Sequence, residues 1–166
     1  YITLLIATNV LALAAEKPIA SGNTPKYDVI IIGGTPAGIA AAIAAGRAEK
    51  RVMIIEQSPV LGGVLSSGVI RLDDLYMASN SGVMEEFRQR VRAYHRTGLA
   101  EDPLVKAHLT RASNLPWNVA EGRAWEPHTA ARIYAEMVGT FKTIKTRFNE
   151  VAVDVTMFDD RVTGVI

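Results

Sequence analysis

The stretch DVIIIGGTPAG, Asp28 to Gly38, decides the fold of this chain. Its first half is a run of apolar, mostly β-branched residues, which is typical of a strand that is buried on both faces of a parallel sheet. The glycines that follow end this strand at a tight turn. Pro36 can begin a helix, because a first-turn residue has no helical partner for its N–H. The stretch therefore predicts a strand, a glycine turn and a helix in direct succession.

The flanking segments extend this pattern to a βαβ unit. The segment PAGIAAAIAAGRAEK, residues 36–50, is rich in alanine and has few β-branched residues, so we expect a helix. RVMIIE, residues 51–56, predicts a second buried strand. A strand, a turn, a helix and a strand of these lengths form a right-handed unit with parallel strands.

The turn follows the dinucleotide-binding pattern G-x-G-x-x-G, with Thr35 at the second glycine position. Gly33 permits the tight turn, and Gly38 lets the helix pack close to the strand. The helix start then points its N–H groups and the positive end of its dipole at a pyrophosphate. Glu56 ends the second strand, where a carboxylate accepts hydrogen bonds from ribose hydroxyls. A plain strand-to-helix turn with a solvated Glu56 is the alternative.

Thr35 is compatible with two interpretations. A β-branched residue at this position crowds a phosphate that glycine would let approach the backbone. Alternatively, the threonine hydroxyl donates a hydrogen bond to a phosphate oxygen. The spacing of the motif leaves both interpretations open.

The rest of the chain predicts further helices and strands around this unit. Val83, Phe87, Val91 and Tyr94 recur at helical spacing, and we expect the four arginines of FRQRVRAYHR, with His95, on the solvated side of that helix. Asp159 and Asp160 predict a tight turn between two strands. In order, we expect a loop over 57–77, a helix over 81–98, an irregular stretch over 99–123, a helix over 126–140 and strands over 142–148, 151–158 and 161–166. The predicted fold class is α/β, a Rossmann-like βαβ fold with a parallel sheet and a late β-hairpin or meander.

Composition limits the possible functions. The chain has 166 residues, which is enough for one domain or part of one, and a net charge of +1, which gives no electrostatic footprint for nucleic acid. The absence of cysteine excludes disulfides and thiolate-bound metal or iron–sulfur sites within these residues. No pair of histidines has metal-binding spacing, so we expect no metal site.

The N-terminal residues predict export. YITLLIATNVLALAA, residues 1–15, is apolar, carries no charge and ends in small residues, as the core and cleavage site of a signal peptide do. It is shorter than the roughly 20 residues of a membrane-spanning helix, so we expect a periplasmic or secreted protein with no membrane span in the mature chain. A buried N-terminal strand or helix is the alternative. Residues 16–26 predict a linker, and residues 27–166 the domain.

Several stretches together resemble a known family. YDVIIIGGTPAGIAAAIAAGR (27–47) and VMIIEQSPVLGGVLSSG (52–68) resemble the FAD-binding opening of oxidoreductases built on the glutathione-reductase-type Rossmann domain. The chain is most similar to the large family called FAD-dependent oxidoreductase, in which GGTPAG is a frequent form of the loop and some bacterial members are named xanthan lyase. WEPHTAARIYAEMV (125–138) and the final RVTGVI also match this family.

The resemblance implies FAD as the cofactor and two-electron oxidation or reduction as the reaction. It implies a small-molecule substrate and an electron acceptor that the sequence does not specify. Carried over by position, it places Glu56 at the adenosine ribose and the doublet Gly62-Gly63 at the pyrophosphate or the ribityl chain. Along the pyrophosphate it places Gly33, Gly34, Pro36, Ala37 and Gly38, and the family accepts Thr35 within this loop.

The chain departs from the family in one respect. Members are much longer and carry a substrate domain and a second FAD-contacting glycine motif near the C-terminus, and these 166 residues contain neither. We therefore expect the N-terminal portion of such an enzyme, with a domain that is incomplete at its C-terminus. A classical NAD(P)-dependent dehydrogenase domain and a non-catalytic fragment are the alternatives. A sugar lyase lacks support, because no residue here supplies a lyase base.

Two residues are candidates for catalysis. His128 lies at an expected helix start and could move a proton to or from substrate. Arg71 follows the glycine doublet and could border the flavin or the substrate. Both also have a simpler interpretation, His128 as part of a helix start and Arg71 as part of a solvated turn, so no catalytic residue is assigned.

Overall fold

The computed structural model describes residues 26–69, 81–97, 103 and 122–166. The expected signal peptide, most of the linker and most of the irregular stretch over 99–123 lie outside these residues, as does Arg71. The elements are β1 (Val29–Ile32), α1 (Pro36–Arg47), β2 (Val52–Glu56), α2 (Val64–Ser67), α3 (Gly82–Thr97), α5 (Pro127–Gly139), β3 (Ile144–Phe148), β4 (Val155–Phe158) and β5 (Arg161–Val165).

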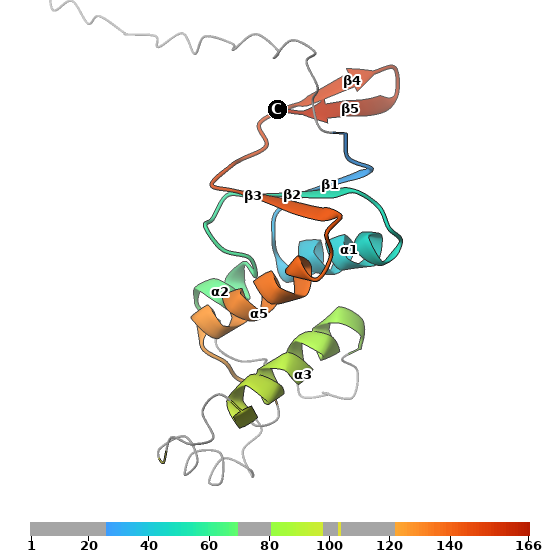
Figure 1. Cartoon of the computed structure of the whole chain (residues 1–166). Helices are drawn as coiled ribbons and strands as arrows, with labels where there is room; N and C mark the ends of the chain where they lie inside the picture. The colour runs from blue at the N-terminus through green and yellow to red at the C-terminus, as the bar shows by residue number, and fades with distance from the viewer. Residues whose placement is uncertain (1–25, 70–80, 98–102, 104–121) are drawn as a thin grey trace, which may run out of the picture.

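Three parallel strands form the central sheet, in the order β1-β2-β3. Val29 pairs with Val52, and Val52 pairs with Ile144, which sets the register across all three strands. The order β1-α1-β2 confirms the predicted βαβ unit. Figure 1 shows the helices on one side of the sheet and the hairpin of β4 and β5 on the other.

The core lies between this sheet and the helices. Successive side chains of a strand point to opposite faces, and Val52, Ile54 and Ile144 point from the sheet into the core, where they are buried. Ile39 and Ile43 of α1 meet them from the other side. The small side chains of the alanines and Gly46 in α1 let this helix approach the sheet closely. A Cβ on Gly46 would lie 2.9 Å from Ile144 Cδ1.

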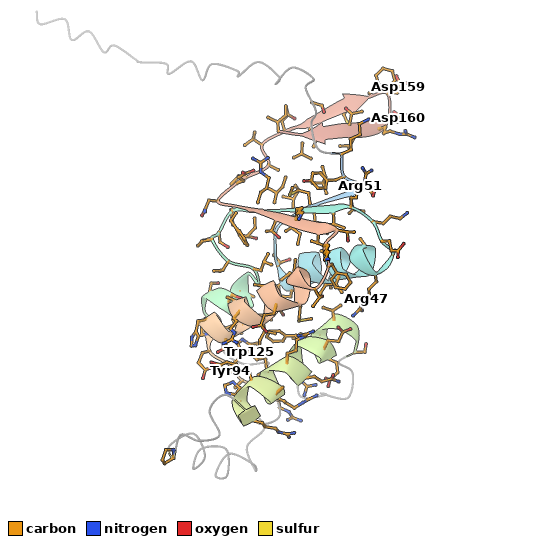
Figure 2. All side chains as sticks on the ribbon, in the orientation of Figure 1. Arg47, Arg51, Tyr94, Trp125, Asp159 and Asp160 are labelled. Carbon is orange, nitrogen blue, oxygen red and sulfur yellow. The ribbon has the colours of Figure 1, made fainter. Side chains whose placement is uncertain are left out.

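An aromatic cluster joins α3 to α5 and α2. Phe87 stacks on Tyr134 with ring centroids 4.4 Å apart, and it meets the edge of Trp125 at 5.1 Å. The Trp125 indole N–H donates a hydrogen bond to the backbone carbonyl of Leu65 at 3.1 Å. This bond holds α2 against the cluster. Phe87 and Val91 are fully buried, which confirms the predicted apolar stripe of α3. Figure 2 labels Trp125 and Tyr94 in this layer.

The polar side of α3 differs from the prediction. Arg88 is only 5% exposed, and its guanidinium donates to Glu85 and to the backbone carbonyl of Gly122. His95 is 1% exposed, so it does not lie on a solvated surface. Gly122 contacts Arg88, and Glu126 lies 3.6 Å from His95, which helical spacing alone could not reveal.

Two further expectations change in detail. The expected loop over 57–77 contains the short helix α2, and its residues 70–77 lie outside the described residues. Of the two late arrangements that the sequence left open, the structure has the hairpin, in which β4 pairs with β5, and β3 joins the parallel sheet. Asp159 and Asp160 form the predicted turn at the tip of that hairpin (Figure 2), where Asp159 has a positive φ of 52°.

The face of the sheet opposite the helices is apolar and only partly covered by the residues that the structure describes. Ile30 and Ile32 point to this side and are 38% and 58% exposed. The strand register places Met53 and Ile55 beside them, of which Met53 is buried and Ile55 is partly buried. Within the described residues no helix lies on this side (Figure 1), although parallel sheets in proteins are ordinarily covered on both faces. The hairpin also exposes apolar side chains, namely Val155, Met157, Phe158 and Val162.

Candidate cofactor-binding site

The predicted dinucleotide loop lies between β1 and α1 and has the expected glycine chemistry. Gly33 has a φ of 95°, which glycine adopts readily, and its N–H donates to the carbonyl of Ile55 at 2.8 Å. A Cβ on Gly38 would overlap the carbonyl oxygen of Gly33 and lie 3.2 Å from Ile31 Cγ2. Gly38 is therefore the residue that lets α1 pack against β1, as predicted.

Thr35 has a structural role that the sequence analysis missed. It is the N-cap of α1, and its hydroxyl oxygen accepts a hydrogen bond from the N–H of Gly38 at 3.2 Å. Its φ of −69° and ψ of 167° are extended values that threonine adopts without strain. A threonine followed by a proline at the first helical position is an ordinary helix-start signal and could have revealed this role. The hydroxyl hydrogen is not used in this bond.

The start of α1 suits a phosphate group. The first turn of a helix leaves backbone N–H groups without partners inside the helix, and the helix dipole makes this end positive. Thr35 and Ala37 are exposed at this end, next to Pro36, and the first turn contains no acidic residue. An anionic pyrophosphate therefore fits here on chemical grounds.

Glu56 is bound to the loop at the carboxyl end of β2. One carboxylate oxygen accepts from the N–H of Gly34 at 2.6 Å, and the other accepts from the N–H of Ser58 at 2.7 Å. The side chain is only 5% exposed. Burial raises the pKa of this carboxyl, but the hydrogen bonds from Ser58 and Gly34 together outweigh burial and hold the pKa below its usual range. Glu56 is therefore a charged acceptor at neutral pH and not a solvated strand-end residue.

The glycine doublet packs directly against the loop. The N–H of Gly62 donates to the carbonyl of Gly34 at 2.8 Å. Gly62 and Gly63 have φ values of 114° and 52°, both in the region that favours glycine. A Cβ on Gly63 would lie 3.4 Å from Thr35 Cα. The structure therefore brings together three features that are separate in the sequence: the loop, Glu56 and the doublet.

The candidate catalytic residues are less informative. His128 is exposed at the start of α5, with a ring nitrogen 3.4 Å from the Thr129 hydroxyl. Its catalytic role stays a prediction, and Arg71 lies outside the described residues. Among the residues that the structure describes, no three metal-ligating side chains gather at one place. No helix in the same ranges has the length and apolar character needed to cross a membrane.

Comparisons with known proteins identify the family to which the chain is similar. A family model described as FAD dependent oxidoreductase matches residues 28–166. A soluble pyridine nucleotide transhydrogenase of Mycobacterium tuberculosis is 30% identical over 122 residues, 63% of this chain and 26% of that protein. A 4-oxocyclohexanecarboxylate 2-dehydrogenase of Sinomonas cyclohexanicum is 31% identical over 100 residues, 56% of this chain and 17% of that protein.

A solved structure shares the fold. L-amino acid deaminase from Proteus vulgaris superposes with a TM-score of 0.51 at 16% identity, over 88% of this chain and 45% of that one. At this identity the similarity shows the fold alone. The chain spans about a quarter or less of the length of the two curated relatives.

Proposed function

Because the chain belongs to the FAD dependent oxidoreductase family, with FAD as its cofactor, we propose that it forms the FAD-binding portion of a larger oxidoreductase. Bound FAD supplies a ring system that takes up or gives two electrons, and the substrate is a small molecule. The observation that carries this proposal is the joining of the glycine loop, Glu56 and the doublet at one end of the sheet. The family match favours this function over a classical NAD(P)-dependent dehydrogenase.

The site residues have separate roles in this proposal. Glu56 accepts hydrogen bonds from the adenosine ribose, and Thr35 donates its remaining hydroxyl hydrogen to a phosphate oxygen. Gly62 and Gly63 border the pyrophosphate or the ribityl chain. The pyrophosphate lies along Gly33, Gly34, Pro36, Ala37 and Gly38. The helix cap at Thr35 supports its role, because accepting from Gly38 leaves the hydroxyl hydrogen available for donation.

The larger size of the enzyme is also a proposal. It is supported by the exposed Ile30 and Ile32 on the sheet face that carries no helix among the described residues, and by the short span of the chain on its relatives. The missing portion would supply the substrate-binding groups and contact the electron acceptor. His128 and Arg71 are the residues of this chain that we would test first for a part in proton transfer or substrate binding.

Cofactor binding is tested with the purified 166-residue chain. Thermal unfolding, followed by circular dichroism, is measured with FAD, NAD⁺ or NADP⁺ present. We expect FAD alone to raise the melting temperature, because a ligand at 100 times its dissociation constant stabilises by about 2.7 kcal/mol. Stabilisation by NAD⁺ or NADP⁺ instead would support the dehydrogenase alternative. Stabilisation by none of the three would support a non-catalytic fragment.

The role of Thr35 is tested by titration calorimetry with FAD. Thr35→Gly keeps an accepted N-cap residue but removes the hydroxyl. A tenfold weaker binding of FAD, equal to about 1.4 kcal/mol, would support the phosphate contact. Unchanged affinity would show that the hydroxyl is dispensable for binding.

We further propose that the protein is exported, on the basis of the apolar run over residues 1–15. The test is to express the gene in its host, recover the protein from the periplasm or the medium, and determine its N-terminus by mass spectrometry. Cleavage shortly after Ala14 is expected. A cytoplasmic protein that retains residues 1–15 would contradict export.

A further inference from the structure

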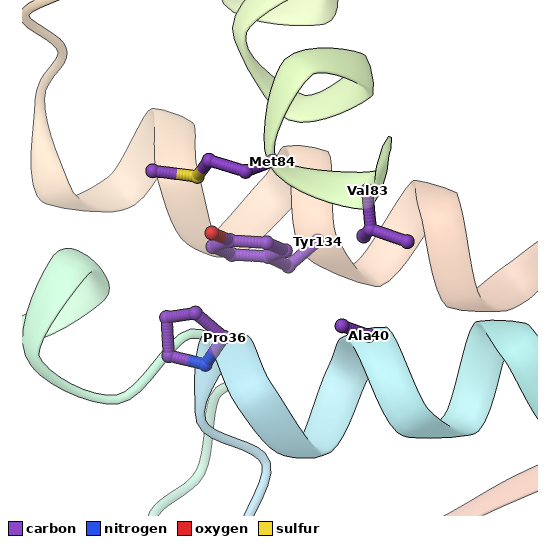
Figure 3. A pocket seen from close by; sticks show the side chains of 5 residues that line it. All are labelled: Pro36, Ala40, Val83, Met84 and Tyr134. Carbon is purple, nitrogen blue, oxygen red and sulfur yellow. The ribbon is translucent and has the colours of Figure 1, made fainter. Parts of the chain in front are cut away.

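A second candidate binding site lies between three helices. A pocket of about 270 Å³ opens between α1, α3 and α5 (Figure 3), and it is lined by Pro36, Ala40, Val83, Met84 and Tyr134. No lining residue is charged. An apolar cavity of about 150 Å³ is large enough to hold benzene, so this pocket has room for a single-ring molecule.

One polar group stands out in this apolar lining. Tyr134 is 1% exposed, and its hydroxyl has no hydrogen-bond partner in the described structure. Figure 3 shows this hydroxyl at the end of the ring, between the side chains of Met84 and Pro36. Burial raises the pKa of Tyr134 far above its usual value, so the phenol keeps its proton. The hydroxyl is therefore a hydrogen-bond donor that lacks an acceptor.

We propose that this pocket binds a small, neutral, cyclic compound with one carbonyl oxygen, to which the Tyr134 hydroxyl donates a hydrogen bond. The apolar lining favours a hydrocarbon ring, and a charged ligand would lose its hydration without gaining a partner. The single donor selects for a single acceptor. Met84 lies over the hydroxyl (Figure 3) and has three rotatable bonds, so it can move aside and pack against the ring of the ligand.

The pocket adjoins the cofactor loop but does not belong to it. Pro36 directly follows the N-cap Thr35, and a Cβ on Gly62 would lie 2.9 Å from Tyr134 Cδ2. A ligand in the pocket would therefore touch the first turn of α1 and the ring that supports the glycine doublet. The proposal does not depend on the proposed function, because the pocket and its hydroxyl are present in the chain without a cofactor.

The test uses cyclohexanone as the probe and the 166-residue chain with ¹³C-labelled methionine methyl groups. Loss of one signal in Met84→Leu assigns the Met84 methyl. We expect this signal to shift saturably, with a dissociation constant on the order of millimolar for so small a ligand. In Tyr134→Phe the ring stays in place and the donor is lost, and we expect binding to weaken about tenfold.

Two alanines of α1 provide a variant that blocks the pocket and its matched control. Ala40→Leu fills the pocket and should abolish the shift, whereas Ala44→Leu changes an exposed position of the same helix and should leave it unchanged. Tyr134→Phe should melt at the same temperature as the parent chain or higher, since it removes a buried hydroxyl without a partner. Equal affinity in Tyr134→Phe, or a saturable shift that persists in Ala40→Leu, would overturn the proposal.

Discussion

The two faces of the central sheet differ in how far their side chains are exposed. On one face Val52, Ile54 and Ile144 are buried under α1 and α5. On the other face Ile30 and Ile32 are exposed, although they too are β-branched apolar residues of a parallel strand. The alternation of side chains along a strand sends neighbouring residues of one sequence run into these two environments.

This difference separates the side chains that are expected to stabilise the fold from those that remain exposed on its surface. The covered face is expected to supply the free energy of folding, because that is where apolar surface leaves water. The opposite face is apolar, and Ile30 and Ile32 on it are expected to contribute less, because they stay largely exposed to water. The cofactor loop lies at the end of the sheet between the two faces, and it depends on the covered face through α1.

The largest effect is expected in the aromatic cluster beneath the covered face. Phe87→Ala removes a fully buried ring that contacts Trp125 and Tyr134, and it should lower the free energy of unfolding by about 4 kcal/mol. Phe158→Ala on the hairpin is the matched control, because that ring is 72% exposed. Urea denaturation of both variants measures the difference. Equal losses would show that the hairpin, too, is buried in solution.

A slightly smaller effect is expected where α1 meets β1. Gly38→Ala places a methyl group against the carbonyl oxygen of Gly33, so α1 must move away from the sheet, at a cost of about 3 kcal/mol. FAD affinity should fall as well, because the loop moves with the helix. Gly139→Ala is the control, since a Cβ there meets no atom within 4 Å. A fully stable Gly38→Ala protein would contradict the tight contact.

Replacing Glu56 tests the end of the sheet. Glu56→Gln can accept from only one of the two N–H groups of Gly34 and Ser58, and it should cost about 2 kcal/mol at pH 7. The folded-state pKa of Glu56 lies below its ordinary value of 4.5, so its stabilisation is present at neutral pH. That stabilisation is lost as pH falls from 4.5 through the folded pKa.

The gap between parent and Glu56→Gln should therefore close in acid. Urea denaturation at several pH values from 7 downward measures it. Glu49→Gln, at an exposed position after α1, serves as the control and should show no such gap. A gap that stays constant at low pH would mean that the charge of Glu56 does not stabilise the loop.

The smallest effect is expected at Ile32, on the sheet face opposite the helices. Ile32→Thr keeps a β-branched side chain, is 58% exposed in the parent, and should change the free energy of unfolding by less than about 0.5 kcal/mol. The same substitution at Ile54, which is buried, should cost several times more. If Ile32→Thr proves as costly as Ile54→Thr, the face is covered in solution and the contrast between the faces fails.

The order of elements could be predicted from sequence because each signal is local. The β-branched runs, the alanine-rich segment and the spacing of Phe87 and Val91 report on short stretches of chain. The burial of Arg88 and His95 could not be predicted, since it depends on a distant segment packing over α3. The partner of β3 could not be predicted for the same reason, because its run of residues suits both a meander and a parallel sheet.

The candidate site shows the same division. The glycine loop and Glu56 follow a recognisable pattern, and the structure brings them together as expected. That Glu56 binds the N–H of Gly34 could not be read from the pattern, because a carboxylate at a strand end has several possible partners. The N-cap role of Thr35 could have been predicted, because a threonine followed by a proline at the first helical position is an ordinary helix start.

Gly34 has a consequence for the kinetics of cofactor binding. Its N–H donates to Glu56 and its carbonyl accepts from the N–H of Gly62, so both backbone polar groups of this residue are held by hydrogen bonds. A cofactor that arrives at the loop meets a backbone already set in one conformation. Its association rate should be governed by diffusion and orientation rather than by a slower rearrangement of the loop.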